Sequence, residues 1–264
     1  MKIGFIGLGN MATAMIGGMV AKKIVDAKDI LGSSKSKESV DKAVNAFNIT
    51  GKADNHEVAK EADILFLSVK PQMYPLVIEE IKNDVKENVI IVSIAPGKTI
   101  EWITNLFGKN VKLVRCMPNT PALVGEGCTG VCHSENVTEE EFAKVMELLC
   151  SFGKAYEVAE HLMDAVVGVS GSSPAYVFMF IEAMADQAVA DGIPRKLAYE
   201  FAAQSVLGSA KMVLETGKHP GELKDMVCSP AGTTIQAVKV LEQKGLRSAV
   251  MEAQDACVKK AKGV

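Results

Sequence analysis

The chain reads, close to its start, Ile3-Gly4-Phe5-Ile6-Gly7-Leu8-Gly9-Asn10-Met11-Ala12. An apolar strand, predicted over residues 2–6, runs directly into a Gly-x-Gly-x-x-Ala fingerprint that opens a helix. Gly7 permits the tight turn, Gly9 lets a pyrophosphate approach the backbone, and Ala12 lets the helix pack closely on the strand. The helix N-terminus adds amide donors and a positive dipole end. A turn without a ligand is the alternative, but the position after a first strand favours a dinucleotide-binding unit.

The rest of the first half alternates short apolar runs with helical spacing. Strands are predicted over 30–33, 64–69, 89–94 and 111–116, and helices over 11–22, 37–47, 74–82, 99–107 and 138–150. The runs at 64–69 and 89–94 are almost continuously apolar, which is typical of parallel strands that are buried on both faces. The pattern predicts an α/β fold with a Rossmann-type, doubly wound parallel sheet.

Beyond about residue 160 the sequence predicts only helices, over 174–191, 194–215, 221–227, 233–244 and 246–262. We therefore expect a dinucleotide-binding domain over 1–158 and an all-α C-terminal domain over 159–264. The helix that begins near Ala175 is apolar nearly all round, so it should be buried on most faces. A domain of this size offers too little of its own surface to cover it, which predicts dimerisation through the all-α domain.

Composition excludes several classes of protein. The 264 residues include 29 Lys+Arg and 32 Asp+Glu, a formal charge of −3, so nucleic acid and anionic membrane surfaces are not expected partners. The apolar run from Tyr176 to Ile181 stops at Glu182, which predicts no membrane span, and the start of the chain fails as a signal peptide. A cytoplasmic location is therefore expected. The six cysteines and four histidines show no metal-binding spacing, so no metal is expected.

The end of the second predicted strand bears on cofactor choice. An acidic residue there would bind the ribose 2′-hydroxyl of NAD, but residues 32–37 contain none. Ser33, Ser34 and Lys35 are instead suited to a 2′-phosphate, which a carboxylate would repel and an ammonium group attracts. NADPH is predicted to be preferred, with NADH possible, although a solvated loop would show the same residues. The loops that follow the next strands, at Val69-Lys70-Pro71 and Ala95-Pro96-Gly97, should flank the nicotinamide.

A second candidate site lies near the C-terminus, at Ser229-Pro230-Ala231-Gly232-Thr233-Thr234. Small residues before a helix leave room for a carboxylate to reach bare amides and the two threonine hydroxyls. The alternative is an ordinary helix cap in which threonine satisfies its own helix.

Four blocks of sequence resemble the pyrroline-5-carboxylate reductase family over essentially the whole chain. They are Phe5-Ile6-Gly7-Leu8-Gly9-Asn10-Met11-Ala12, Ser68-Val69-Lys70-Pro71, Arg115-Cys116-Met117-Pro118-Asn119-Thr120-Pro121 and the segment from Leu223 to Thr234. The last is the family's signature region, with Gly232 and Thr234 in its Gly-x-Thr. Ser173 stands where the family usually has glycine, in Ser170-Gly171-Ser172-Ser173-Pro174-Ala175-Tyr176.

The resemblance implies reduction of 1-pyrroline-5-carboxylate to L-proline with NAD(P)H, the final step of proline biosynthesis. It implies a homodimer that assembles further into a higher homo-oligomer. Substrate would face Lys224, Thr233 and Thr234, with Thr234 as the catalytic partner of the ring nitrogen; a dedicated general acid is not identified, and Tyr176 is expected in the core. The cofactor would be bound by Ile6, Gly7, Leu8, Gly9, Asn10, Met11, Ser33, Ser34, Lys35, Asn55, Val69, Lys70, Pro71, Ala95 and Gly97.

Two rival functions make different predictions. A β-hydroxyacid dehydrogenase should carry Gly-x-x-Gly-x-Gly-x-x-x-Lys-x-x-x-Asn at the domain junction, but here Val177 and Ile181 occupy the lysine and asparagine positions. A non-catalytic NADP-binding regulator would bind cofactor without turnover, and it would have no need of a carboxylate site at Thr233 and Thr234.

Overall fold

The computed structural model describes residues 1–263 and consists of two compact units. One unit spans Met1–Ser172 together with the residues from Cys257 onward, and the other spans Ser173–Ala256. The division falls later than the expected domain boundary after residue 158. The segment that follows residue 158 stays with the first unit because it is bound to the sheet, for example through the ion pair between Arg115 and Glu160.

The first unit is built on one eight-stranded sheet with the order β3-β2-β1-β4-β5-β6-β7-β8. Every neighbouring pair is parallel except β6 and β7, which are antiparallel. The five predicted strands are all confirmed; β3, β7 and β8 were not predicted. The strands are β1 Ile3–Ile6, β2 Ile30–Ser33, β3 Thr50–Gly51, β4 Ile64–Leu67, β5 Ile90–Ser93, β6 Lys112–Met117, β7 Gly127–His133 and β8 Gly153–Glu157.

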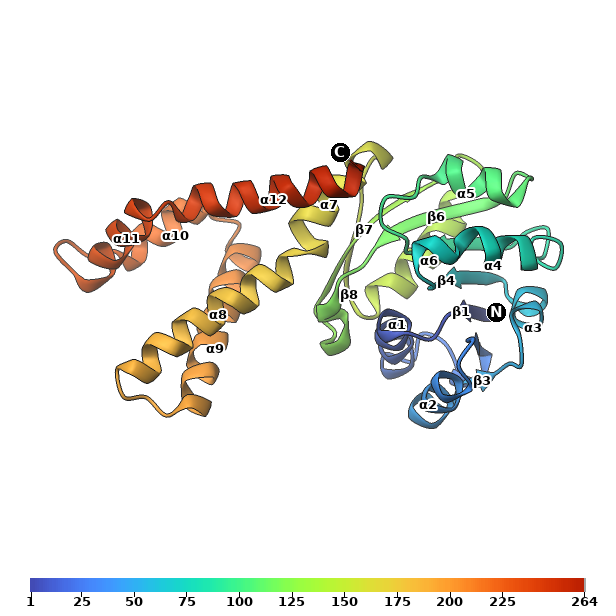
Figure 1. The fold of residues 1–264 in the computed structure, drawn as a ribbon, viewed down its shortest axis with the longest axis horizontal. Helices are drawn as coiled ribbons and strands as arrows, with labels where there is room; N and C mark the ends of the chain where they lie inside the picture. The colour runs from blue at the N-terminus through green and yellow to red at the C-terminus, as the bar shows by residue number, and fades with distance from the viewer. Residues whose placement is uncertain (264) are drawn as a thin grey trace. The chain divides into compact units, whose positions relative to one another are not determined.

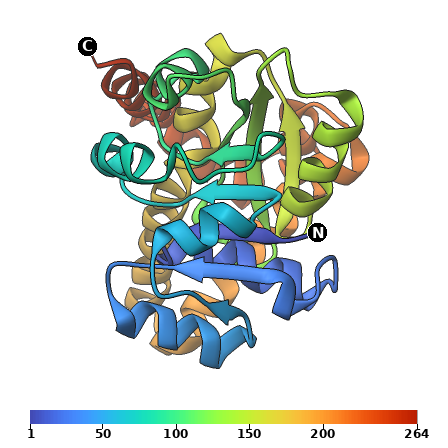
Figure 2. The same ribbon diagram turned by 90° about the vertical axis from the view of Figure 1, so that its right-hand side faces the viewer.

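Helices cover both faces of this sheet (Figure 2). The sheet is twisted, so the strand direction changes gradually from the blue strands to the yellow-green ones. The predicted helices are confirmed to within a residue or so, and α3 is an addition. The helices are α1 Asn10–Ala21, α2 Lys37–Phe47, α3 Asn55–Glu61, α4 Tyr74–Ile81, α5 Ile100–Phe107 and α6 Glu139–Cys150. A short helix, α7 Met163–Val166, and a π-helical turn over Val167–Gly171 complete the unit before α12 returns to it.

Successive residues of each central strand enter two different apolar layers. Phe5 and Phe66 belong to the layer under α1, α2 and α6, where their rings stack at 4.6 Å, whereas Ile6 and Leu65 belong to the layer under α3, α4 and α5. Because both faces of the strands are buried, both sets of side chains are apolar. This explains why the predicted strands were visible as continuous apolar runs.

The second unit contains only helices, as expected: α8 Ser173–Ala190, α9 Arg195–Thr216, α10 Pro220–Val227, α11 Thr233–Gln243 and most of α12 Leu246–Lys262 (Figure 1). Helices α8 and α9 pack through Ala185, Ala198 and Ala202. Most of α8 is not covered by this chain, since Phe178 is 61% and Met179 is 69% exposed. The burial expected for this helix is therefore not provided within this chain.

The helical run Glu160–Ala190 is long and apolar enough to cross a membrane by length and composition, with a mean hydropathy of 1.3. The expectation that no segment reaches this threshold, based on Glu182, was therefore too strict. Length and composition are weak evidence on their own, because apolar helices in contact with protein pass the same test.

Candidate functional site

The turn between β1 and α1 has the geometry that a pyrophosphate requires. Gly7 adopts a φ of +94°, its N–H donates to the Ser33 carbonyl at 2.9 Å, and a Cβ on it would lie 2.9 Å from the Ser68 backbone. Gly9 is the N-cap residue of α1, with no side chain capping the helix, and a Cβ built on it would meet no atom within 4 Å. Open space in front of uncapped amides fits an anionic group, so these residues are suited to a dinucleotide.

The strand register brings the other predicted cofactor residues to the same edge of the sheet. Ile6 is paired with both Ser33 and Leu67, and Leu67 is paired with Ser93. The loops with Ser34 and Lys35, with Val69 to Pro71, and with Ala95 and Gly97 therefore all leave the carboxyl ends of adjacent parallel strands. The strand order reverses between β1 and β4, and this switch point is where open α/β sheets bind ligands.

Tyr74 supports two of these loops, a role that could not be predicted from the sequence. Its hydroxyl donates to the Leu67 carbonyl at 2.7 Å and lies 3.1 Å from Ser93 Oγ, so it joins the ends of β4 and β5. Burial raises the pKa of the Tyr74 phenol. A neutral, fully buried phenol with two partners holds strand ends in place rather than transferring protons.

The end of β2 carries a chain of hydrogen bonds. Ser33 is buried, and its Oγ donates to Asn55 Oδ1 at 2.8 Å, at the start of α3. Asn55 Nδ2 in turn donates to Glu80 Oε2, on α4, at 2.9 Å. Ser34 and Lys35 follow Ser33, half-buried and exposed respectively. Asn55 thus lies beside the end of β2, and Glu80 is an unpredicted neighbour.

The second candidate site begins at α11. Gly232 is the N-cap residue, no side chain caps the helix, and Thr233 and Thr234 form the first turn. A Cβ on Gly232 would lie 2.4 Å from Ser229 Oγ and 3.1 Å from the Ser229 carbonyl oxygen, so a larger residue here would displace the Ser229 side chain. The N-cap residue is a glycine, which has no side chain to cap the helix, so the first-turn amides are open to a ligand.

Lys224, the third predicted substrate residue, forms its ion pair with Asp225 on its own helix. It is half-buried on α10, its Nζ is 2.5 Å from Asp225 Oδ1, and this contact raises its pKa. It lines a pocket of about 580 Å³ with Val238, Leu241, Glu242, Leu246, Arg247, Val250 and Met251, whereas neither threonine does. Lys224 thus lines a pocket with Val238, which lies one helical turn after Thr234 on α11.

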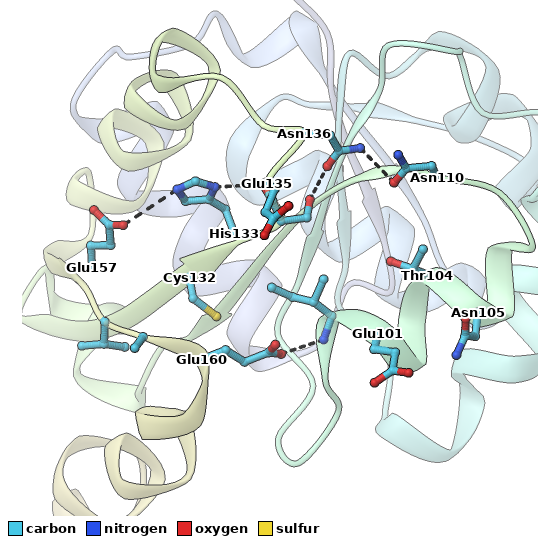
Figure 3. Close-up of a pocket in the computed structure, with 14 residues that line it drawn as sticks. Glu101, Thr104, Asn105, Asn110, Cys132, His133, Glu135, Asn136, Glu157 and Glu160 are labelled. Carbon is cyan, nitrogen blue, oxygen red and sulfur yellow. Dashed lines mark hydrogen bonds and ion pairs between the residues drawn. The ribbon is translucent and has the colours of Figure 1, made fainter.

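A larger pocket, of about 790 Å³, lies beside the ends of β7 and β8 (Figure 3). His133 Nε2 is 3.8 Å from Glu157 there, and the Ile100 amide donates to Glu160 at 2.7 Å. Burial raises the pKa of the Cys132 thiol to about 12, which favours its neutral form. None of the predicted site residues lines this pocket, and no group of three or more metal ligands occurs within residues 1–263. We therefore take the strand ends beside the glycine turn, and not this larger pocket, as the candidate cofactor site.

Two further residues of the Arg115–Pro121 block have structural contacts that the sequence did not reveal. Arg115, 4% exposed, contacts Glu160 at 3.2 Å and Asp164 at 3.6 Å. Asn119, also buried, donates from Nδ2 to the Ser170 carbonyl at 2.9 Å and accepts from the Cys128 amide at 2.8 Å. Both tie the segment that follows β8, including its π-helical turn, to the sheet.

Comparison with known proteins identifies the family. The model for pyrroline-5-carboxylate reductase dimerisation matches residues 160–264, and the model for NADP oxidoreductase, coenzyme F420-dependent, matches residues 2–97. A pyrroline-5-carboxylate reductase of Escherichia coli is 52% identical over 98% of this chain and 97% of its own length. The Arabidopsis thaliana enzyme of the same name is 41% identical over 99% of this chain and 94% of its own length.

Solved structures agree with the sequence comparison. The Plasmodium falciparum pyrroline carboxylate reductase with NADP bound superposes with a TM-score of 0.91 at 32% identity, covering 99% of this chain and 97% of that one. Prephenate dehydrogenase from Aquifex aeolicus, at 15% identity and a TM-score of 0.56, shares the fold alone. With relatives this similar over nearly the full length of both chains, the protein belongs to the pyrroline-5-carboxylate reductase family.

Proposed function

We propose that this protein reduces 1-pyrroline-5-carboxylate to L-proline with NADPH as the preferred cofactor, the final step of proline biosynthesis. The observation that carries the proposal is identity of 52% to a reductase of that name over 98% of the chain. The open, uncapped amino end of α1 behind Gly9 supports it independently, because it offers a place for the cofactor's pyrophosphate.

The chain's own residues have separate tasks in this proposal. The first-turn amides of α1 hold the pyrophosphate, Ser34 and Lys35 hold the 2′-phosphate, and the loops at Val69–Pro71 and Ala95–Gly97 orient the nicotinamide. When bound, NADPH supplies the hydride that reduces the carbon–nitrogen double bond.

The substrate needs little chemical assistance from side chains. A protonated cyclic imine is already an electrophile, and its proton comes from solvent, so binding and orientation are the main requirements. The amides of the first turn of α11 take the carboxylate, and the Thr234 hydroxyl bonds the ring nitrogen. Lys224, which contacts Asp225 and not the threonines, remains a proposed electrostatic contributor.

We extend the proposal to assembly and location. The dimerisation family model over 160–264 and the exposed apolar side chains of α8 support a homodimer through the all-α domain. Assembly of the dimer into a higher homo-oligomer, and residence in the cytoplasm away from membranes, remain expectations from the sequence.

The test is imine-dependent loss of NADPH absorbance with the purified protein, together with identification of proline as the product. Thr234→Ala should lower kcat/KM for the imine about 10- to 100-fold, the size of a lost hydrogen bond to a charged group, and leave the NADPH Kd unchanged. Thr216→Ala, at the exposed end of α9, is the matched control. Tight NADPH binding without turnover would instead support the regulator, and equal loss of cofactor affinity in Thr234→Ala would remove Thr234 from the substrate site.

A further inference from the structure

We propose that Glu80 is a specificity residue for the cofactor: held against Asn55 beside the end of β2, its carboxylate lowers the preference for the 2′-phosphorylated nicotinamide cofactor. The inference rests on the proposed function and deepens it. The residues at the strand end favour NADPH, and Glu80 limits that preference so that NADH is also used.

The geometry joins Glu80 to the strand end by two hydrogen bonds, from Ser33 Oγ to Asn55 Oδ1 at 2.8 Å and from Asn55 Nδ2 to Glu80 Oε2 at 2.9 Å. A carboxylate can only accept, so the Asn55 amide must turn its NH₂ toward Glu80 and its carbonyl toward Ser33. The Ser33 hydroxyl then donates to Asn55. Glu80 therefore determines which way the polar groups at this corner point.

The polarity suits an unphosphorylated ribose. With its proton committed to Asn55, Ser33 offers only lone pairs to a neighbouring group, and lone pairs bind a ribose hydroxyl but not a phosphate oxygen. Rossmann domains that bind NAD place a carboxylate after this strand. Here residues 32–37 contain none, and α4 brings one to the same corner from elsewhere in the chain.

The charge of Glu80 acts in the same direction. Two hydrogen bonds and one amide group join Glu80 to Ser33, a path of about one Debye length (about 8 Å at physiological ionic strength), so we expect a weak, partly screened repulsion of a 2′-phosphate bound beside Ser33. Glu80 is exposed, and its Oε1 lies 3.7 Å from His56 Nε2. His56 is held more closely by Asp84, at 2.5 Å, and Asp84 also pairs with Lys60 at 3.5 Å. The cations at this corner thus moderate the effect of Glu80 without cancelling it.

The experiment compares Glu80→Gln with Glu79→Gln. Glu79 is the preceding residue on the same helix and carries the same charge, but its partner is Lys82, at 2.8 Å. The Kd values of NADPH and NADH are measured by nicotinamide fluorescence without imine, and kcat/KM for both cofactors is then measured with imine. Glu80→Gln should raise the NADPH to NADH preference about three- to tenfold, mainly through tighter NADPH binding. Glu79→Gln should leave the ratio as in the wild type.

Two more variants calibrate the change in the NADPH to NADH preference. Glu80→Lys should raise the ratio further than Glu80→Gln, because it reverses the charge, and Ser34→Asp should lower it by placing a carboxylate at the strand end. An unchanged ratio in both Glu80 variants would overturn the proposal. So would an equal loss of affinity for both cofactors, which is the signature of a structural role, or the same shift in Glu79→Gln. Absence of imine turnover would count against the proposed function alone, because the cofactor Kd ratios are measured without imine.

Discussion

Two glycines of one fingerprint have different physical roles, and single substitutions separate them. At Gly7, alanine meets both a left-handed φ of +94° and the Ser68 backbone at 2.9 Å, so Gly7→Ala should destabilise the fold by about 1–2 kcal/mol or more. At Gly9, alanine meets no protein atom within 4 Å, and the poorer N-cap costs at most about 1 kcal/mol. Its methyl group instead fills the space in front of the α1 amides.

We therefore expect Gly9→Ala to weaken NADPH binding about tenfold or more, because charge-assisted contacts to the pyrophosphate are lost. Thermal unfolding and cofactor titration of both variants check this. Wild-type NADPH affinity in Gly9→Ala would show that the pyrophosphate does not approach this residue.

Helices α3 and α4 are joined by an ion pair whose strength depends on pH. Asp84, just after α4, raises the pKa of His56 on α3 above 6.5, and His56 lowers the pKa of Asp84 below 3.8. The histidine contribution to stability is complete below pH 6.5 and is lost as pH rises through the raised pKa. The aspartate contribution is complete above pH 3.8 and is lost as pH falls through the lowered pKa. The pair is thus strongest between these two values.

His56→Gln should accordingly flatten the stability profile on the alkaline side. Between roughly pH 6 and pH 9 the wild type should lose more unfolding free energy than the variant, by a small amount because solvent reaches both groups of this half-buried pair. Denaturant titrations of both proteins across this range measure the difference. Parallel profiles would mean that His56 has the same pKa in the folded and unfolded states.

The strands that could be predicted from the sequence are those that are buried on both faces of the sheet. Strands β1, β4 and β5 are apolar at every position that enters either core layer, whereas β7 contains two glycines and β8 is an edge strand with an exposed Tyr156. Neither β7 nor β8 therefore shows the continuous run of apolar residues by which a buried strand is predicted. Helix α3 has seven residues and buries only Val58 and Ala59, which leaves almost no periodic signal.

The same limit applies to the candidate site. The glycines and the strand-end loops carry local signals, so they were found in the sequence. Tyr74 and Glu80 both come from α4, whose residues are those of any amphipathic helix. Their importance depends on which strand ends α4 reaches, and that is a property of the tertiary structure.

At the scale of the whole molecule, the apolar face of α8 predicts assembly. Phe178 and Met179 are 61% and 69% exposed within this chain, although they lie in the long apolar helical run Glu160–Ala190. In a symmetric dimer each residue is buried twice, so one substitution acts on two contacts. Burial of a phenylalanine stabilises by about 1.5–3 kcal/mol.

Phe178→Glu should therefore raise the dimer dissociation constant at least about 100-fold, since it removes that burial at two places and adds two carboxylates to an apolar interface. Sedimentation equilibrium over a dilution series measures the constant directly. Leu76→Glu is the matched control, because Leu76 is 65% exposed on α4 of the first unit and outside the dimerisation segment. Equal dissociation in both variants would indicate a general effect of charge, and an intact dimer in Phe178→Glu would place the interface on another face of the helical unit.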